Sequence, residues 1–151
     1  MIKLEKYNED YLNFSWDWLN DPETKYLTNT NSFTKDDQLK WFDSLEERID
    51  YKIWGVSYNE IAIGVFGIKN IDFIQNCGEY WGYIGEKKFR GKGLGKIILK
   101  IILEIASNEL MLEKIYLKVL EDNNVAINLY KSFDFKRINN EGCLIVMKKV
   151  F

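Results

Sequence analysis

The fold is decided by one short stretch, Arg90-Gly91-Lys92-Gly93-Leu94-Gly95-Lys96, which joins a predicted strand to a predicted helix. Residues 79–85 before it are aromatic and apolar, and the residues after it, to about 108, are mostly Ile and Leu. Glycines let the backbone approach a ligand closely, and a helix N-terminus presents unpaired N–H groups to an anion. Together with the lysines around it, the loop predicts a site for a di- or triphosphate group.

Two common phosphate-binding loops do not match this stretch. A Walker A loop needs a Gly five residues before its Gly-Lys pair and a Ser or Thr after it, and these positions hold Arg90 and Ile97. The dinucleotide pattern G-x-G-x-x-G would need a third glycine where Lys96 stands. For the glycine cluster alone, a flexible basic surface loop is the alternative.

The composition is that of an ordinary globular protein without histidine. The 151 residues are 46% hydrophobic and 29% charged, and 21 basic against 23 acidic residues give a net charge of −2. Such a balance disfavours a nucleic-acid partner, and the absence of His removes the usual general base and the commonest metal ligand. We therefore expect a single domain over residues 1–151, with no metal site.

We expect a cytoplasmic protein with no membrane partner. Residues 1–10 contain no apolar core of a signal peptide, and the most apolar stretch, 97–106, is interrupted by Lys100 and Glu104. Two cysteines, Cys77 and Cys143, are too few for a secreted disulfide framework.

The hydrophobic periodicity predicts an α/β domain with the element order β-α-α-β-β-β-α-β-α-β-β. Asn8 and Thr34 are expected to cap the first two helices, the first ending at Asp21-Pro22 and the second burying Leu39, Phe42, Leu45 and Ile49. The expected strands cover residues 2–7, 51–58, 61–69, 79–85, 115–119, 135–138 and 143–149, with a last helix over 123–133.

Two spaced motifs carry a family resemblance. Arg90-x-x-Gly93-x-Gly95, followed after a strand by Asn123-x-x-Ala126-x-x-x-Tyr130-x-x-x-x-Phe135, resembles the acetyl-CoA-binding core of the GNAT superfamily of N-acetyltransferases, over about residues 61–135. Trp18-Leu19-Asn20-Asp21-Pro22 and Gln38-x-x-Trp41 resemble the subgroup of ribosomal-protein, polyamine and amino-sugar acetyltransferases. The resemblance implies a mixed, mostly antiparallel central sheet flanked by helices. Asp134 departs from it, since the family usually has Gly there.

The resemblance also implies acetyl-CoA as co-substrate and assigns its binding residues. The pyrophosphate would be bound by the loop Arg90, Gly91, Lys92, Gly93, Leu94, Gly95 and Lys96, through its backbone N–H groups. Tyr83, Ile84 and Gly85 would pair with the pantetheine arm, which enters where this strand and the next splay apart, and Asn123 would contact it. Tyr130 would donate a proton to the departing thiolate.

Without histidine, the catalytic base has to be a carboxylate, a backbone carbonyl or a water chain. Glu79 is our candidate, because it precedes the glycine loop by one strand and matches a Glu of the subgroup. Strand alternation puts it on one face with Trp81 and Tyr83, whose rings would make the carboxylate bind a proton more tightly. We expect direct transfer in a ternary complex rather than a covalent route through Cys77.

The acceptor is predicted to be a primary amine, most simply of a small molecule such as an amino-sugar nucleotide. Trp18, Trp41 and Trp81 could line its pocket, and an acidic set, Asp36, Asp37, Glu46, Glu47 and Asp50, could attract a cation or simply be solvated. A polyamine or protein amine acceptor, or a catalytically silent acyl-CoA-binding module, are the alternatives. A homodimer stays open.

Overall fold

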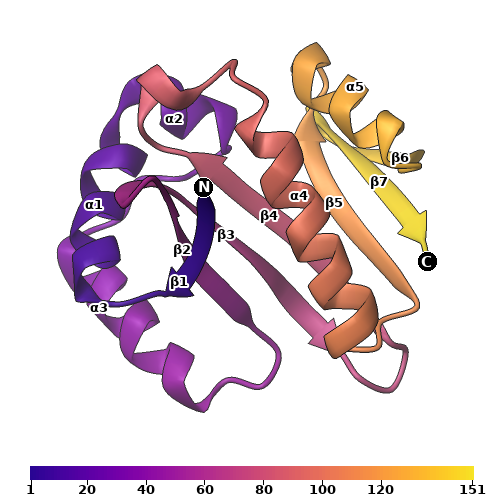
Figure 1. Cartoon of the computed structure of the whole chain (residues 1–151), viewed down its shortest axis with the longest axis horizontal. Helices are drawn as coiled ribbons and strands as arrows, with labels where there is room; N and C mark the ends of the chain where they lie inside the picture. Colours follow the sequence, from indigo (N-terminus) through magenta and orange to yellow (C-terminus); the bar gives the residue numbers. More distant parts are fainter.

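The computed structural model describes all residues from Met1 to Phe151 and contains one seven-stranded sheet of order β1-β2-β3-β4-β5-β7-β6 (Figure 1). The strands are β1 (Ile2–Lys6), β2 (Lys52–Tyr58), β3 (Ile61–Asp72), β4 (Cys77–Ile84), β5 (Lys114–Leu120), β6 (Lys136–Glu141) and β7 (Leu144–Val150). The α-helices are α1 (Glu9–Asn20), α2 (Pro22–Leu27), α3 (Lys35–Ser44), α4 (Leu94–Glu104) and α5 (Asn124–Ser132). The expected α/β architecture with a mixed, mostly antiparallel sheet is confirmed.

The sheet is divided by one incomplete pairing. Every neighbouring pair is antiparallel except β4 and β5, which run parallel and pair only where Cys77, Gly78 and Glu79 oppose Lys114, Ile115 and Tyr116. Beyond Glu79, β4 continues on β3 and β5 continues on β7, so the two strands form an open fork. The splaying that the family resemblance implied is thus present.

Helix α4 covers one face of the sheet and crosses the fork (Figure 1). Its sequence LGKIILKIILE is apolar on most sides, and Ile98, Leu99 and Ile102 have no exposed surface. They belong to a core of 20 buried residues that takes in both halves of the sheet, for example Ile68 of β3 and Ile115 of β5. Burial at about 25 cal/mol per Å² of apolar surface therefore holds the halves together where strand pairing does not.

The opposite face carries α1 and α3 and a smaller aromatic core. Asn8 caps α1 by accepting the Tyr11 amide at 3.1 Å, as predicted. Tyr7, Tyr11, Leu12, Trp18 and Val65 form this core, and the half-buried Trp41, Trp81 and Tyr83 pack against it. One face of β4 is thereby lined with aromatic rings.

Helix α2 was not predicted, because Asp21-Pro22 was interpreted only as the end of the first helix. Asp21 instead caps a new helix: its side chain accepts the Thr24 amide at 3.0 Å, and Pro22 occupies the first turn. Proline is favoured there because the N–H group that it lacks would have no helical partner. The signal for α2 was present in the sequence.

The inner stripe predicted for the second helix was partly wrong. Leu39 and Ile49 are 50% and 77% exposed, whereas Trp41, Phe42 and Leu45 pack on the aromatic core. The inward-facing stripe begins instead at Gln38, whose side chain donates to the Leu12 carbonyl at 3.0 Å. Ile49 lies beyond the end of α3 at Ser44.

Helix α4 ends earlier than residue 108, where the helix after the glycine loop was expected to end. At Glu104 it passes into a π-helical turn, Ile105–Glu109. No helix has the length and apolar character needed to cross a membrane.

Candidate active site

The fork leaves two strand edges inside the sheet without a strand partner. An extended ligand with amide groups can pair with such an edge, as an added strand does. Of the residues predicted to bind pantetheine, the Ile84 carbonyl already accepts the Arg90 Nε at 2.8 Å, and the Gly85 amide donates to the Ile63 carbonyl at 2.7 Å. Hydrogen bonds from Tyr83, Ile84 and Gly85 to the pantetheine arm stay a prediction.

The glycine loop at the open end of the fork fits an anion. Gly91 and Gly93 have φ of +71° and +77°, a left-handed conformation that disfavours any side chain, and nothing lies within 4 Å of where a Cβ would stand. Gly93 is the N-cap of α4 and supplies no side-chain hydrogen bond, so the first amides of α4 are without a capping partner. The positive end of the helix dipole and these amides suit the pyrophosphate of CoA.

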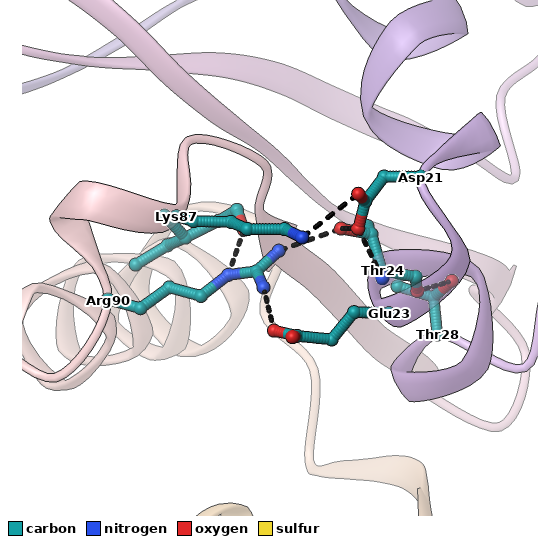
Figure 2. A network of polar contacts seen from close by, with 7 residues as sticks. Asp21, Glu23, Thr24, Thr28, Lys87 and Arg90 are labelled. Atoms are coloured by element: carbon teal, nitrogen blue, oxygen red, sulfur yellow. Dashed lines mark hydrogen bonds and ion pairs between the residues drawn. The ribbon is translucent and has the colours of Figure 1, made fainter.

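Arg90 is directed away from the glycine loop. Its guanidinium donates to Glu23 Oε1 and to Thr24 Oγ1, each at 2.8 Å, in addition to the Ile84 carbonyl (Figure 2). Lys87 makes a parallel ion pair with Asp21, 2.9 Å long. Arg90 is thus engaged by protein partners through all three nitrogens. The sequence carried no signal for the contacts with Glu23 and Thr24, because these residues lie more than 60 positions away.

Tyr130 lies on α5, which Asn123 caps by accepting the Ala126 amide through its side chain at 3.3 Å. The Tyr130 ring packs edge-on against Tyr80 at 6.2 Å and Phe135 at 5.9 Å between ring centroids. Burial raises the pKa of Tyr130 to about 12. The hydroxyl therefore stays protonated at neutral pH, as a proton donor has to be.

Asp134, the departure from the family pattern, takes φ of +69°, which is the left-handed conformation that a glycine would adopt there. Asp tolerates this region better than most residues.

Glu79 stands at the point where the fork opens, with its side chain 15% exposed. The Lys69 ammonium lies 3.6 Å from its carboxylate, so a cation joins the aromatic neighbours that the sequence predicted. The pKa of Lys118 is raised, first by its hydrogen bond to Glu141 and also by the charge of Glu79. Glu79 thus lies at the opening of the fork beside a cation, and its role as the base stays a prediction.

An aromatic pocket of about 390 Å³ lies on the same face of β4. It is lined by Tyr7, Ser15, Leu19, Thr30, Phe33, Asp37, Gln38, Trp41, Val65, Trp81 and Tyr83. Two of the three predicted pocket tryptophans line it, whereas Trp18 is buried beside it, with its ring centroid 6.3 Å from that of Tyr83.

A second cavity, of about 520 Å³, opens between α2 and the end of β5. It is lined by Pro22, Lys25, Tyr26, Asn29, Thr30, Leu120, Glu121, Asp122 and Cys143. Thr30 borders both cavities, so they adjoin at the loop after α2. No group of three or more Cys, Asp or Glu side chains could hold a metal ion.

A sheet split beside a glycine-rich helix start defines a class of transferases that hold a CoA thioester between two strands. The family model described as "Acetyltransferase (GNAT) family" matches residues 11–135, and the chain belongs to this family. It is an N-acetyltransferase that uses acetyl-CoA.

Individual relatives share between 19% and 31% of their residues with this chain. Acetyltransferase PseH of Campylobacter jejuni is 27% identical over 138 residues, covering 89% of this chain and 85% of the relative. Its structure with acetyl coenzyme A has a TM-score of 0.77 at 19% identity and covers 99% of both chains. Spermine/spermidine N(1)-acetyltransferase of Bacillus subtilis is 31% identical over 91 residues, which is 57% of this chain and 60% of that protein. Spermidine N-acetyltransferase of Vibrio cholerae, solved with CoA and spermine, has a TM-score of 0.87 at 19% identity, covering 97% and 92%.

Proposed function

We propose that the acceptor is the primary amine of a small molecule, and that an amino-sugar nucleotide is the class that fits best. The observation that carries this proposal is the aromatic pocket on the face of β4 where the fork opens. Its volume of about 390 Å³ suits one or two rings, and flat aromatic walls such as Trp41 and Trp81 favour stacking with a sugar or a base.

The pocket is also nearly uncharged, which favours a ring over a polycation. Burial raises the pKa of Tyr7 to about 12 and raises the pKa of Tyr83 further, so these two phenols of the lining stay neutral. Asp37 is the single charged residue in the lining, and its carboxylate accepts the Thr34 amide at 3.0 Å in a capping box. Little negative charge is left for a polyamine in this pocket.

Each proposed catalytic residue has one task. Acetyl-CoA supplies an acetyl thioester; the acceptor nitrogen forms the C–N bond as the C–S bond breaks. Glu79, through water, takes the proton that the nitrogen loses, and Tyr130 gives its proton to the thiolate sulfur. The amides from Gly91 to Lys96 bind the pyrophosphate, with Lys92 and Lys96 as the nearby free cations, and Tyr83, Ile84, Gly85 and Asn123 guide the pantetheine.

A polyamine is the second candidate, and the adjoining cavity supports it. Glu121 and Asp122 line that cavity, and carboxylates at its wall would attract an ammonium group. Asp122 is however already bonded to the Tyr26 hydroxyl at 2.6 Å. Two relatives are named for spermine or spermidine, which also supports this alternative.

The test is thiol release from acetyl-CoA with a panel of amino-sugar nucleotides, polyamines and peptide amines. We expect turnover with one sugar nucleotide, lost in Tyr130→Phe and retained in Tyr58→Phe, which removes a hydroxyl from a ring packed on Phe89. Turnover only with polyamines would reject the first candidate, and turnover only with peptides would reject both. Binding of acetyl-CoA without turnover on any amine would favour the silent module.

Two further expectations belong to the same proposal. We place the enzyme in the cytoplasm and allow a homodimer, for which sedimentation equilibrium is the measurement. Direct transfer predicts that Cys77→Ala keeps full activity, since Cys77 lies at the closed end of the fork.

A further inference from the structure

Helix α2 is tied at its start to the segment that precedes the glycine loop. Arg90 donates to Glu23 and to Thr24, and Lys87 pairs with Asp21, so three consecutive contacts cross from residues 87–90 to the first turn of α2 (Figure 2). The Thr24 hydroxyl relays this network, because it accepts from Arg90 at 2.8 Å and donates to Asp21 Oδ2 at 3.1 Å. Arg90 also holds the Ile84 carbonyl, so it joins the end of β4 to α2.

The last turn of α2 is tied to the other side of the fork. The Tyr26 hydroxyl donates to Asp122 Oδ2 at 2.6 Å, and Asp122 lies two residues beyond the end of β5 at Leu120. Helix α2 is therefore bonded at its start to residues 87–90, which follow β4, and at its end to Asp122, which follows β5. Its residues Pro22, Lys25 and Tyr26 form one wall of the cavity of about 520 Å³.

Helix α2 has little else to hold it in place. It has only six residues, fewer than an isolated helix needs to be stable, and Thr24 is its single buried residue. Thr24 is 1% exposed, so its hydroxyl needs the partners that Arg90 and Asp21 provide. The position of α2 thus depends on polar ties rather than on apolar packing.

We propose that Arg90 and Lys87 are positioning residues, through which CoA bound at the glycine loop orders α2 and so sets one wall of the cavity of about 520 Å³. The inference rests on the proposed binding of the CoA pyrophosphate at Gly91 to Lys96. An anion held by these amides immobilises the backbone that carries Arg90 and Lys87, and their side chains transmit the constraint to Asp21, Glu23 and Thr24.

The coupling is thermodynamic and has to be reciprocal. If CoA orders α2, then an intact α2 network also strengthens CoA binding by the same factor. Couplings of this kind are about fivefold or more, and the charge-assisted bond of Arg90 to the buried Thr24 hydroxyl is stronger than a bond between neutral groups.

Hydrogen exchange measured by mass spectrometry tests this without any acceptor, with CoA itself as the probe. In the wild type we expect CoA to slow exchange at residues 91–96 and, by about fivefold or more, at residues 22–30. In the double variant Glu23→Gln/Thr24→Val we expect protection at 91–96 to persist and protection at 22–30 to fall below about twofold. Thr24→Ser, which keeps a hydroxyl, should retain the wild-type response.

The matched control is Asp36→Asn, which removes the exposed Lys40–Asp36 pair of 3.1 Å on α3 and should leave the response to CoA unchanged. Equal protection of α2 in the double variant and the wild type would overturn the inference. Absent protection at 91–96 in the wild type would overturn the glycine-loop assignment and the inference with it. If the double variant does not fold, Glu23→Gln alone, at an exposed carboxylate, gives the same comparison with a smaller expected loss.

Discussion

Replacing Tyr130 by Phe removes one hydroxyl and keeps the ring between Tyr80 and Phe135. The packing of α5 is preserved, so the change isolates the proposed proton transfer to the thiolate. Acetyl-CoA binding should change by less than about threefold, because the hydroxyl is proposed to act only as the C–S bond breaks.

The size of the effect follows from the two acidities. Burial raises the pKa of Tyr130 to about 12, whereas an ordinary thiol has a pKa of about 8.5. Complete transfer to a free thiolate would be uphill by about 3.5 pKa units, or roughly 5 kcal/mol at 1.36 kcal/mol per unit. The Tyr130 hydroxyl therefore donates a hydrogen bond to the sulfur, and gives up its proton only late in the reaction, when negative charge has developed on the sulfur. We expect the lower end of the usual range for general acids, a loss in kcat of about 100-fold or ~2.7 kcal/mol.

The assay is steady-state thiol release between pH 6.5 and 10.5 at saturating acetyl-CoA, with the amine that turns over best. Because the pKa of Tyr130 is raised to about 12, its ionisation should produce no fall in wild-type kcat near pH 10. A loss in kcat below about fivefold, or a tyrosine-dependent fall centred at pH 10, would refute the reasoning.

Four other outcomes are expected. Glu79→Gln should lower kcat by about tenfold or more with unchanged acetyl-CoA affinity in titration calorimetry, and a change within twofold would remove Glu79 as the base. Gly93→Ala should weaken CoA binding about tenfold or more, whereas Gly142→Ala, with φ of +58° in the turn between β6 and β7, should cost similar stability without weakening CoA. Ile102→Ala should lower the free energy of unfolding in urea by about 2–5 kcal/mol, because Ile102 is wholly buried; a loss under 1 kcal/mol would contradict the core assignment. The pKa of Asp21 is lowered to about 2, first by its hydrogen bond from the Thr24 amide and then by Lys87. Its contribution to stability is therefore complete above about pH 4 and is lost as the pH falls through 2. The NMR chemical shift of the Thr24 amide should accordingly titrate near pH 2; a midpoint near about 3.9 would contradict this.

The sequence predicted those features that depend on neighbours along the chain. The predicted caps at Asn8 and Thr34 both form, because a cap and its amide partner are three residues apart. The strand-loop-helix order around Gly93 is equally local and was also correct. The splaying of β4 and β5 followed from the family resemblance rather than from periodicity.

Contacts between distant segments could not be predicted in this way. Nothing near Arg90 indicates that its guanidinium is bound by Glu23, and nothing near Glu79 indicates Lys69 on the neighbouring strand. The aromatic pocket likewise forms only when α1, α3 and β4 meet, although Trp41 and Trp81 could be named as candidates. Leu39 was wrongly predicted to face inward on α3, because an apolar residue was preferred to the neighbouring polar Gln38, which in fact faces inward.

The open fork also affects how the protein behaves when CoA is absent. A strand edge without a partner is a template for pairing with another chain, and proteins usually place such edges only at the rim of a sheet. Here β4 and β5 diverge in the middle of the sheet, after only three paired residues. In the proposed binding mode the co-substrate also covers these two inner edges, so we expect the enzyme without CoA to be the form most prone to edge-to-edge aggregation.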